Sequence, residues 1–215
     1  NYKNGDNLVG AITTIGNATV IGSNFVNNSG RWGGALSVMG GESSSATNFI
    51  DIDGTKFVNN SALYGGAMFV WGSNYSISNS VFDNNSAFGK GNMTPNDNNG
   101  AAIEVTNTDK AITGTISKST FTNNKAQYGG AIYICEGNIA ISDSLFENNS
   151  ADVEGGAIDI NTVNGNPEVS ISGSKFINNS APLGGAILNI KDLTVKRSPF
   201  INNTPNTIFN WVGAG

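Results

Sequence analysis

The segment Phe57-Val58-Asn59-Asn60, followed closely by Gly65-Gly66-Ala67, recurs from one end of the chain to the other. The Phe-x-Asn-Asn part occurs seven times in 215 residues, beginning at Phe25, Phe57, Phe82, Phe121, Phe146, Phe176 and Phe200. A unit of this size repeated along a sequence is typical of solenoids and repeat arrays, so the repeats decide the fold before any local motif is considered.

The seven units stay in register around the Phe. Five residues before it lies a β-branched residue in each unit, namely Val20, Ile52, Ile77, Ile116, Ile141, Ile171 and Val195. Two residues before it lies a hydroxyl residue, namely Ser23, Thr55, Ser80, Ser119, Ser144, Ser174 and Ser198. A run of surface loops with recurring turns would leave the repeated Phe and Ile unexplained, so that alternative is disfavoured.

A coil of short parallel strands, in which each unit forms one turn, explains this regularity. Equivalent residues then lie above one another at the strand spacing of roughly 4.8 Å. Phe stacks on Phe inside the coil, Asn stacks on Asn at a bend and bonds its neighbour's amide, and the Gly pair permits a sharp corner. Because apolar residues show no helical period, we predict an all-β, single-stranded parallel β-helix with about seven to eight rungs.

The second part of the unit carries a resemblance to known surface proteins. Gly-Gly-Ala followed by Ile or Leu is complete at Gly33, Gly129, Gly155 and Gly184. Three further copies depart from it at one residue each, at Val9, Met68 and Ala101. Together with Phe-x-x-Asn, this motif resembles the repeats of chlamydial polymorphic outer membrane proteins and of adhesin-like surface proteins of methanogenic archaea. The resemblance covers nearly the whole chain and implies a right-handed parallel β-helix, a solenoid, displayed on a cell surface; it singles out no catalytic residues.

Composition excludes several classes of function. The net charge is −5, the pI is near 4.6 and the 11 basic residues are scattered, so no patch for binding nucleic acid is expected. His, the commonest metal ligand and general base, is absent, and neither a metal nor a cofactor is predicted. Cys135 is alone and cannot form an internal disulfide. Its place in the repeat holds Met39, Trp71 and Thr106 in other units, which indicates a structural, half-buried thiol.

One continuous repeat argues for one domain. We assign residues 1–203 to the repeat domain and residues 204–215, where Gly-Gly-Ala is missing, to a cap over the last turn or a linker to a next domain. No apolar run approaches the ~20 residues of a membrane span, and no signal peptide opens the chain. Because the chain starts in the middle of a repeat, we expect a fragment of a larger, anchored protein. The resemblance implies an extracellular location on a cell surface, and we expect a monomer.

Extra residues occur in every second turn, at 40–46, 106–111 and 162–168. These insertions leave the coil at the same corner, so we expect them to line up along one edge about 10 Å apart. Such loops in solenoids often form the binding face; longer strands or merely tolerated loops are the alternative. A further insertion at 87–98 leaves from the Asn corner, and its Gly and Pro residues predict a loop.

Acidic residues occur at one position of the strand that follows Gly-Gly-Ala. This outward position holds Thr13, Ser37, Phe69, Glu104, Tyr133, Asp159 and Leu188. Glu104 and Asp159 would face the same way about 10 Å apart, near the upper end of the carboxylate separation in inverting glycosidases. Tyr133 would stand between them where a water is needed, and the row has no basic residue to bind an acidic sugar. A solvated outer face is therefore the favoured interpretation.

Aromatic residues offer a second candidate surface. They precede a Gly pair at Trp32, Tyr64 and Tyr128, and they lie on or beside the outward row at Phe69, Trp71 and Tyr133. Such rings can stack on sugars or anchor a protein partner, although they can also shield the backbone of a corner. The candidate ligand-binding residues are Phe69, Trp71, Glu104, Tyr133 and Asp159.

Several Asn-x-Ser/Thr triplets have the form of N-glycosylation sequons. Most coincide with the Asn bend, where a structural role already accounts for them, so Asn17, Asn74 and Asn92 are the favoured glycan acceptors. The Gly-Gly-x-Gly-x-Asp nonapeptide of calcium-binding β-rolls is missing.

These observations predict a non-catalytic cell-surface adhesin module. It would bind a host or symbiont cell, through surface glycans or proteins, by many weak contacts along one face. Two alternatives stay open: a polysaccharide-degrading hydrolase or lyase built on a β-helix, and a passive stalk or spacer without a ligand of its own.

Overall fold

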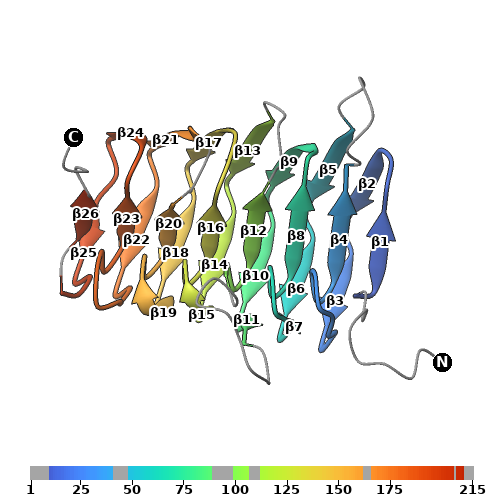
Figure 1. The fold of residues 1–215 in the computed structure, drawn as a ribbon, viewed down its shortest axis with the longest axis horizontal. Coiled ribbons are helices and arrows are strands. Elements are labelled where there is room, and N and C mark those ends of the chain that lie inside the picture. The colour runs from blue at the N-terminus through green and yellow to red at the C-terminus, as the bar shows by residue number, and fades with distance from the viewer. Residues whose placement is uncertain are drawn as a thin grey trace.

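The computed structural model describes residues 10–40, 48–88, 99–106, 112–161, 166–205 and 207–210. Within these ranges all regular elements are β-strands, and all strand pairs are parallel. The strands form four sheets that run along the coil (Figure 1), numbered I to IV in the order in which the chain reaches them. The predicted parallel β-helix is confirmed.

The strands of each sheet come from successive repeats, so each repeat forms one rung. Among the described residues, sheet I has eight strands: β1 (Ile12–Thr14), β4 (Leu36–Met39), β8 (Met68–Trp71), β12 (Ile103–Thr106), β16 (Ile132–Ile134), β20 (Ile158–Ile160), β23 (Ile187–Asn189) and β26 (Ile208–Asn210). Sheet II has seven within the same ranges: β2 (Ala18–Ile21), β5 (Phe49–Asp53), β9 (Asn74–Ser78), β13 (Thr113–Ser117), β17 (Asn138–Ser142), β21 (Glu168–Ser172) and β24 (Asp192–Lys196).

The other two sheets hold the Phe and Asn motifs. Sheet III, again counting described residues, has seven strands: β3 (Asn24–Val26), β6 (Lys56–Val58), β10 (Val81–Asp83), β14 (Thr120–Thr122), β18 (Leu145–Glu147), β22 (Lys175–Ile177) and β25 (Phe200–Ile201). Sheet IV has four in that part of the chain: β7 (Ser61–Ala62), β11 (Ser86–Ala87), β15 (Lys125–Tyr128) and β19 (Ser150–Glu154).

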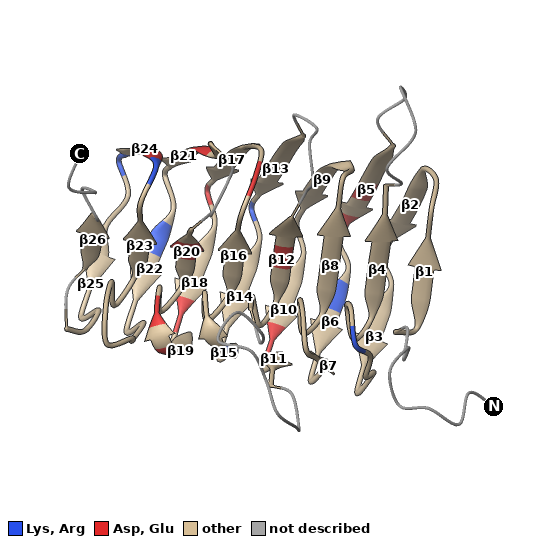
Figure 2. Ribbon diagram, in the orientation of Figure 1, with Lys and Arg blue, Asp and Glu red and all other residues tan. Residues whose placement is uncertain are grey.

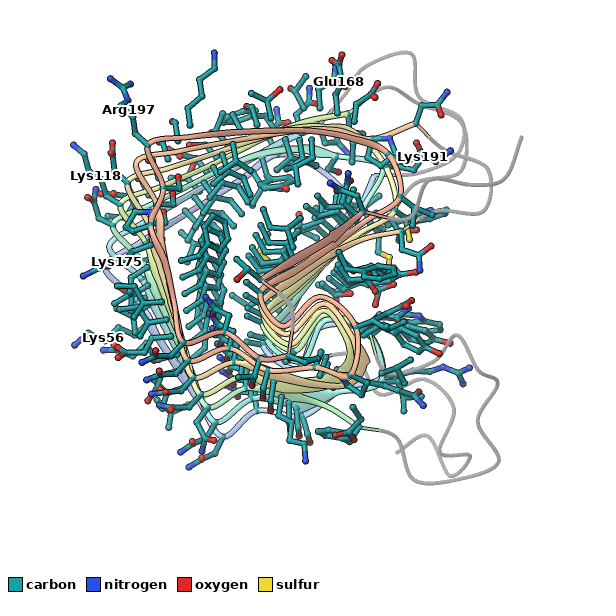
Figure 3. The ribbon with its side chains drawn as sticks, turned by 90° about the vertical axis from the view of Figure 1, so that its left-hand side faces the viewer. Lys56, Lys118, Glu168, Lys175, Lys191 and Arg197 are labelled. Atoms are coloured by element: carbon teal, nitrogen blue, oxygen red, sulfur yellow. The ribbon has the colours of Figure 1, made fainter. Side chains whose placement is uncertain are left out.

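The coil is right-handed, as the family resemblance implied. Figure 3 looks along its axis with the C-terminal end nearest the viewer. Sheet II runs from the side of Glu168 to the side of Arg197, and sheet III then descends past Lys175. The chain thus turns counterclockwise as it approaches the viewer, which defines a right-handed coil.

The Phe of each repeat forms a column inside the coil, on sheet III. Successive rings stack with centroids 4.6–5.1 Å apart and interplanar angles of 3–7°. The five central rings are fully buried, at Phe57, Phe82, Phe121, Phe146 and Phe176. Since burying a Phe side chain contributes about 1.5–3 kcal/mol, this column and the Ile residues of sheets I and II hold the rungs together.

The second Asn of each pair forms a buried hydrogen-bonded ladder. The Oδ1 atom of Asn60 accepts hydrogen bonds from the backbone N and the Nδ2 atom of Asn28, both at 3.0 Å. Its Nδ2 atom donates to the Phe25 carbonyl oxygen at 3.0 Å. The same pattern continues at Asn85, Asn124, Asn149, Asn179 and Asn203.

The first Asn of each pair has a different role. It is exposed and holds the left-handed backbone conformation, with φ between 52 and 59°. The sequence predicts the left-handed turn and the amide ladder at one Asn bend. The structure divides them between two adjacent residues, because only the second side chain faces the interior.

The C-terminal segment continues the coil. The missing motif predicted that the repeat domain ends at residue 203, but β26 pairs in register with β23 as the last described strand of sheet I. Thr204 also bridges to Ser180 of the preceding rung. The coil therefore reaches at least Asn210 without the Gly-Gly-Ala motif.

The insertions of alternate turns are anchored at one corner. The chain leaves sheet I after β4, β12 and β20 and rejoins sheet II at β5, β13 and β21. These are alternate strands of each sheet, so the anchor points line up as predicted. Most of the inserted residues lie outside the described ranges, as do residues 89–98 and the predicted acceptor Asn92.

Candidate binding surface

The predicted outward row exists on sheet I. Strand pairing places the exposed Thr13 at the N-terminal end of this row and stacks six further residues after it: Ser37, Phe69, Glu104, Tyr133, Asp159 and Leu188. Apart from Asn189, their neighbours on either side in each strand belong to the core, so these side chains point away from it. We call these six residues the central row.

The central row is not the solvated face that the sequence favoured. Glu104 is 4% exposed and Asp159 is 0% exposed. The reason is the path of the chain between sheets IV and I, which folds back over this face. The first Gly of each pair takes a left-handed conformation, as at Gly65 with φ of 58°, and lies against the backbone of sheet I.

The residue before each Gly pair is thereby laid over the central row. Bridges between rungs connect these residues into a covering row: Trp32, Tyr64, Asn99, Tyr128, Glu154 and Leu183. The Tyr64 ring centroid lies 6.4 Å from that of Phe69, and the Tyr128 centroid lies 6.5 Å from that of Tyr133. The aromatic residues of the covering row are half-buried, so they present one edge to solvent.

A flanking row closes the other side of the face, at the ends of the sheet I strands. It consists of Met39, Trp71, Thr106, Cys135 and Asn161, all half-buried. The covering, central and flanking rows together are named the outer face of sheet I.

The five predicted ligand-binding residues all lie on this outer face. Trp71 is on the flanking row, and Tyr133 is the half-buried member of the central row. Phe69, Glu104 and Asp159 are buried beneath the covering row. The structure therefore brings the five together but leaves only two with appreciable exposure. Sequence reasoning missed Glu154, although it precedes a Gly pair just as the covering aromatic residues do.

Asp159 is an unusual buried carboxyl group. Neither of its oxygens has a hydrogen-bond partner among the described residues. Burial raises the pKa of Asp159 well above its ordinary value, and the nearby Glu154 carboxylate raises it further. Burial also raises the pKa of Glu154, although Asn161 Nδ2 donates a hydrogen bond to Glu154 Oε1 at 2.9 Å and opposes that shift.

Cys135 is a free, half-buried thiol, as predicted. Burial raises the pKa of Cys135 to about 12, with a further contribution from the Glu104 carboxylate. Hydrogen bonds with Tyr133 and Thr106 act in the opposite direction but do not offset burial. A thiol with this pKa is almost fully protonated at neutral pH and is a poor nucleophile.

The outer face is apolar and acidic. Figure 2 shows the strands of sheet I free of basic residues, with Glu104 on β12 and Asp159 on β20 as their charged residues. Within the described ranges, no group of three or more His, Cys, Asp or Glu side chains is arranged to hold a metal ion. In those same ranges no helix is long and apolar enough to span a membrane.

The fold and this face define a right-handed β-helical repeat protein. Residues 118–135 and 143–161 match the model of the Chlamydia polymorphic membrane protein repeat. The two matched segments are successive rungs that contain Tyr133 and Asp159, so the chain carries repeats of the type that its motifs resemble. No curated protein and no solved structure matches the chain.

Proposed function

We propose that the chain is a non-catalytic module of a cell-surface adhesin and that the outer face of sheet I is its contact surface. The match to a membrane protein repeat supports a surface location. The observation that carries the binding proposal is the group of half-buried aromatic residues on this face: Trp32, Tyr64, Trp71, Tyr128 and Tyr133.

These rings suit weak, repeated contacts. Aromatic side chains offer large contact areas at low cost in conformational entropy, and the stacked rungs hold them at fixed spacing. Because the half-buried Glu154 lies on this face and the strands of sheet I carry no basic residues, the favoured ligand is a neutral or basic group of a glycan or protein on a host or symbiont cell. Many copies on one cell surface would add avidity.

Binding of the intact parent protein to glycan arrays and to whole cells tests this proposal. Trp71→Ala and Tyr128→Ala should each weaken binding about tenfold, as expected for aromatic anchors. Phe49→Ala is the matched control, because Phe49 is 47% exposed but lies on sheet II. Equal losses in all three variants, or no binding on either platform, would contradict the proposal.

A polysaccharide-degrading enzyme is the second candidate, and the Asp159 carboxyl favours it. Carboxyl groups with raised pKa values often serve as general acids, and Glu104 lies two rungs away on the same row. The burial of both groups argues against access by a polymer. Release of reducing ends from polysaccharides, lost in both Glu104→Gln and Asp159→Asn, would favour the enzyme. If the protein neither binds a ligand nor releases reducing ends, the passive spacer is the interpretation that remains.

A further inference from the structure

Besides the left-handed Gly that leads into sheet I, two corners of the rungs hold the left-handed backbone conformation, and these two differ in composition. The corner between sheets II and III has φ from 47 to 59° and holds Gly22, Gly54, Asn79, Lys118, Asp143, Gly173 and Arg197. The corner between sheets III and IV has φ from 52 to 59° and holds Asn27, Asn59, Asn84, Asn123, Asn148, Asn178 and Asn202. The same conformation therefore accepts five residue types at one corner and Asn alone at the other, so backbone conformation does not account for this Asn column.

Hydrogen bonding does not account for the Asn column either. All seven side chains are exposed. Asn84 Nδ2 donates to Asn59 Oδ1 at 2.7 Å, and Asn123 Nδ2 donates to Asp83 Oδ1 at 2.9 Å. The other four make no side-chain hydrogen bond within the described residues: Asn27, Asn148, Asn178 and Asn202. The buried amide ladder belongs to the next residue in each rung.

A second recurring side chain near this corner is also unexplained by the fold. Two residues after the exposed Asn lies a row paired from rung to rung: Ser29, Ser61, Ser86, Lys125, Ser150, Ser180 and Thr204. In five of the seven units an Ala follows and is buried in the coil, as at Ala62 and Ala126, so this row faces outward. Its hydroxyls make no hydrogen bond within the described ranges, and Lys125 takes the same place, paired with Ser86 and Ser150.

The other hydroxyl row of the repeat, which contains Ser119, has a structural role in joining the rungs. Ser119 is buried, its Oγ donates to the Ser117 carbonyl at 2.8 Å, and it accepts a hydrogen bond from the Ser80 backbone N at 3.2 Å. Each hydroxyl oxygen of that row accepts a hydrogen bond from a backbone N of the preceding rung, wherever the structure describes that rung. The outward row has no comparable contacts.

We propose that the exposed Asn column is a series of N-glycosylation sites. An exposed Asn and a hydroxyl two residues later form the Asn-x-Ser/Thr acceptor sequence, which accounts for both unexplained rows at once. The acceptors are Asn27, Asn59, Asn84, Asn148, Asn178 and Asn202. Asn123 is followed by Asn124 and Lys125, so it is the one member of the column that lacks the acceptor sequence.

The reaction is a group transfer catalysed by a membrane oligosaccharyltransferase from a polyprenyl-phosphate-linked oligosaccharide. The Asn Nδ2 atom forms a bond to C1 of the first sugar while the bond from C1 to the phosphate oxygen breaks. The phosphate leaves with the lipid, and the amide loses one proton to a base of the transferase. The glycans would line the edge between sheets III and IV, where bulky hydrophilic groups add solubility.

This assignment differs from the expectation drawn from sequence. Asn17 Oδ1 accepts a hydrogen bond from the Phe49 backbone N at 2.8 Å, and Asn74 Oδ1 accepts one from the Thr113 backbone N at 2.7 Å. The fold therefore explains both of these Asn residues as caps at the start of sheet II, whereas it leaves the corner column unexplained.

Peptide mass spectrometry of the protein isolated from its natural cell surface tests the proposal. Trypsin places Asn123 in residues 119–125, Asn148 in residues 126–175 and Asn178 in residues 176–191. The second and third peptides should carry glycan mass on the named Asn, and the first should be unmodified. Unmodified Asn at all six acceptor positions would overturn the proposal.

Two variants expressed in the natural host make the test specific to the hydroxyl. Ser150→Ala should remove the modification from Asn148, and Lys125→Ser should introduce one at Asn123, with unchanged circular dichroism because both side chains face outward. Retention of glycan on Asn148 in Ser150→Ala would contradict the assignment, as would an unmodified Asn123 in Lys125→Ser.

Discussion

The Asn149 side chain joins the polar ladder of the coil to its aromatic column. Its Oδ1 atom accepts hydrogen bonds from the backbone N and the Nδ2 atom of Asn124, at 3.1 and 2.9 Å. Its Nδ2 atom donates to the carbonyl oxygen of Phe121, at 2.9 Å. One buried amide therefore connects its own rung to the preceding one at two places.

Asn149→Ala should be strongly destabilising. The substitution leaves the Asn124 N–H and the Phe121 carbonyl without this partner in a buried setting. Since an unsatisfied buried group costs about 1–3 kcal/mol, we expect the free energy of unfolding to fall by about 2–5 kcal/mol, measured by urea denaturation.

The adjacent residue supplies the control. Asn148 is exposed and has φ of 55°, a conformation that Gly adopts freely. Asn148→Gly should change the free energy of unfolding by less than about 1 kcal/mol. Similar losses in the two variants would contradict the separate roles of the two Asn residues.

Gly129 and Gly54 separate backbone strain from steric overlap. Both have left-handed φ, 60 and 56°, but a Cβ at Gly129 would overlap the Ile132 carbonyl oxygen, whereas a Cβ at Gly54 would meet nothing within 4 Å. Gly54→Ala should cost about 1–2 kcal/mol from the conformation alone. Gly129→Ala should cost about 1–3 kcal/mol more because of overpacking, and thermal unfolding of both variants checks this. A larger loss of stability in Gly54→Ala than in Gly129→Ala would contradict the added steric overlap at Gly129.

Much of this fold could be predicted because its information is local and repeated. The Phe column and the parallel pairing follow from residues that keep their spacing in every unit, as at Phe57 and Phe82. The continuation through Ile208–Asn210 could not be read in the same way, because that strand pairs with β23 without carrying the motif. Backbone pairing at the end of a sheet tolerates many sequences.

The pH dependence of stability should reveal the buried Asp159. Burial raises the pKa of Asp159 well above its ordinary value of 3.8. At pH values above 3.8 the folded chain keeps a proton on Asp159 that the unfolded chain has lost. The free energy of unfolding therefore falls as pH rises from 3.8 toward the raised pKa. Asp159→Asn removes this loss of stability. Each tenfold difference in proton affinity between the folded and unfolded states corresponds to about 1.4 kcal/mol. We expect a higher melting temperature than wild type at pH 7 and a flatter profile between pH 4 and 7.

The Glu154 carboxyl remains in Asp159→Asn. Because burial raises the pKa of Glu154 too, this residue also makes stability fall as pH rises. Asp152→Asn is the comparison, since Asp152 is exposed and paired with Lys125 at 3.5 Å on the surface. The flattening should be specific to the buried carboxyl, so Asp159→Asn should flatten the profile more than Asp152→Asn does. Parallel profiles for wild type and Asp159→Asn would show that the carboxyl is ionised in the folded chain.

The burial of this site was the main feature that sequence reasoning missed. Alternation along the strand correctly placed Glu104 and Asp159 on the side away from the core. Whether that side meets water depends on the chain returning from sheet IV, which lays Tyr128 and Glu154 over it. This path is set by contacts between segments of successive rungs, and no pattern within one strand reports it.

Cys135 should react slowly in the folded protein. Burial raises the pKa of Cys135 to about 12, and the thiolate is the reactive species. At pH 8 we expect its reaction with Ellman's reagent to be at least about a hundredfold slower than in urea-unfolded chain. Equal rates in the two states would mean that the thiol is freely accessible and unperturbed.

The distance between spin labels on the outer surface of sheet III tests most directly whether each repeat forms one rung. Asn24 and Lys175 are exposed and occupy equivalent positions five rungs apart. With labels at Asn24→Cys and Lys175→Cys in a Cys135→Thr background, double electron–electron resonance should give a narrow distribution near 24 Å, about five strand spacings. A broad distribution, or a mean distance far from this value, would contradict the stacked coil.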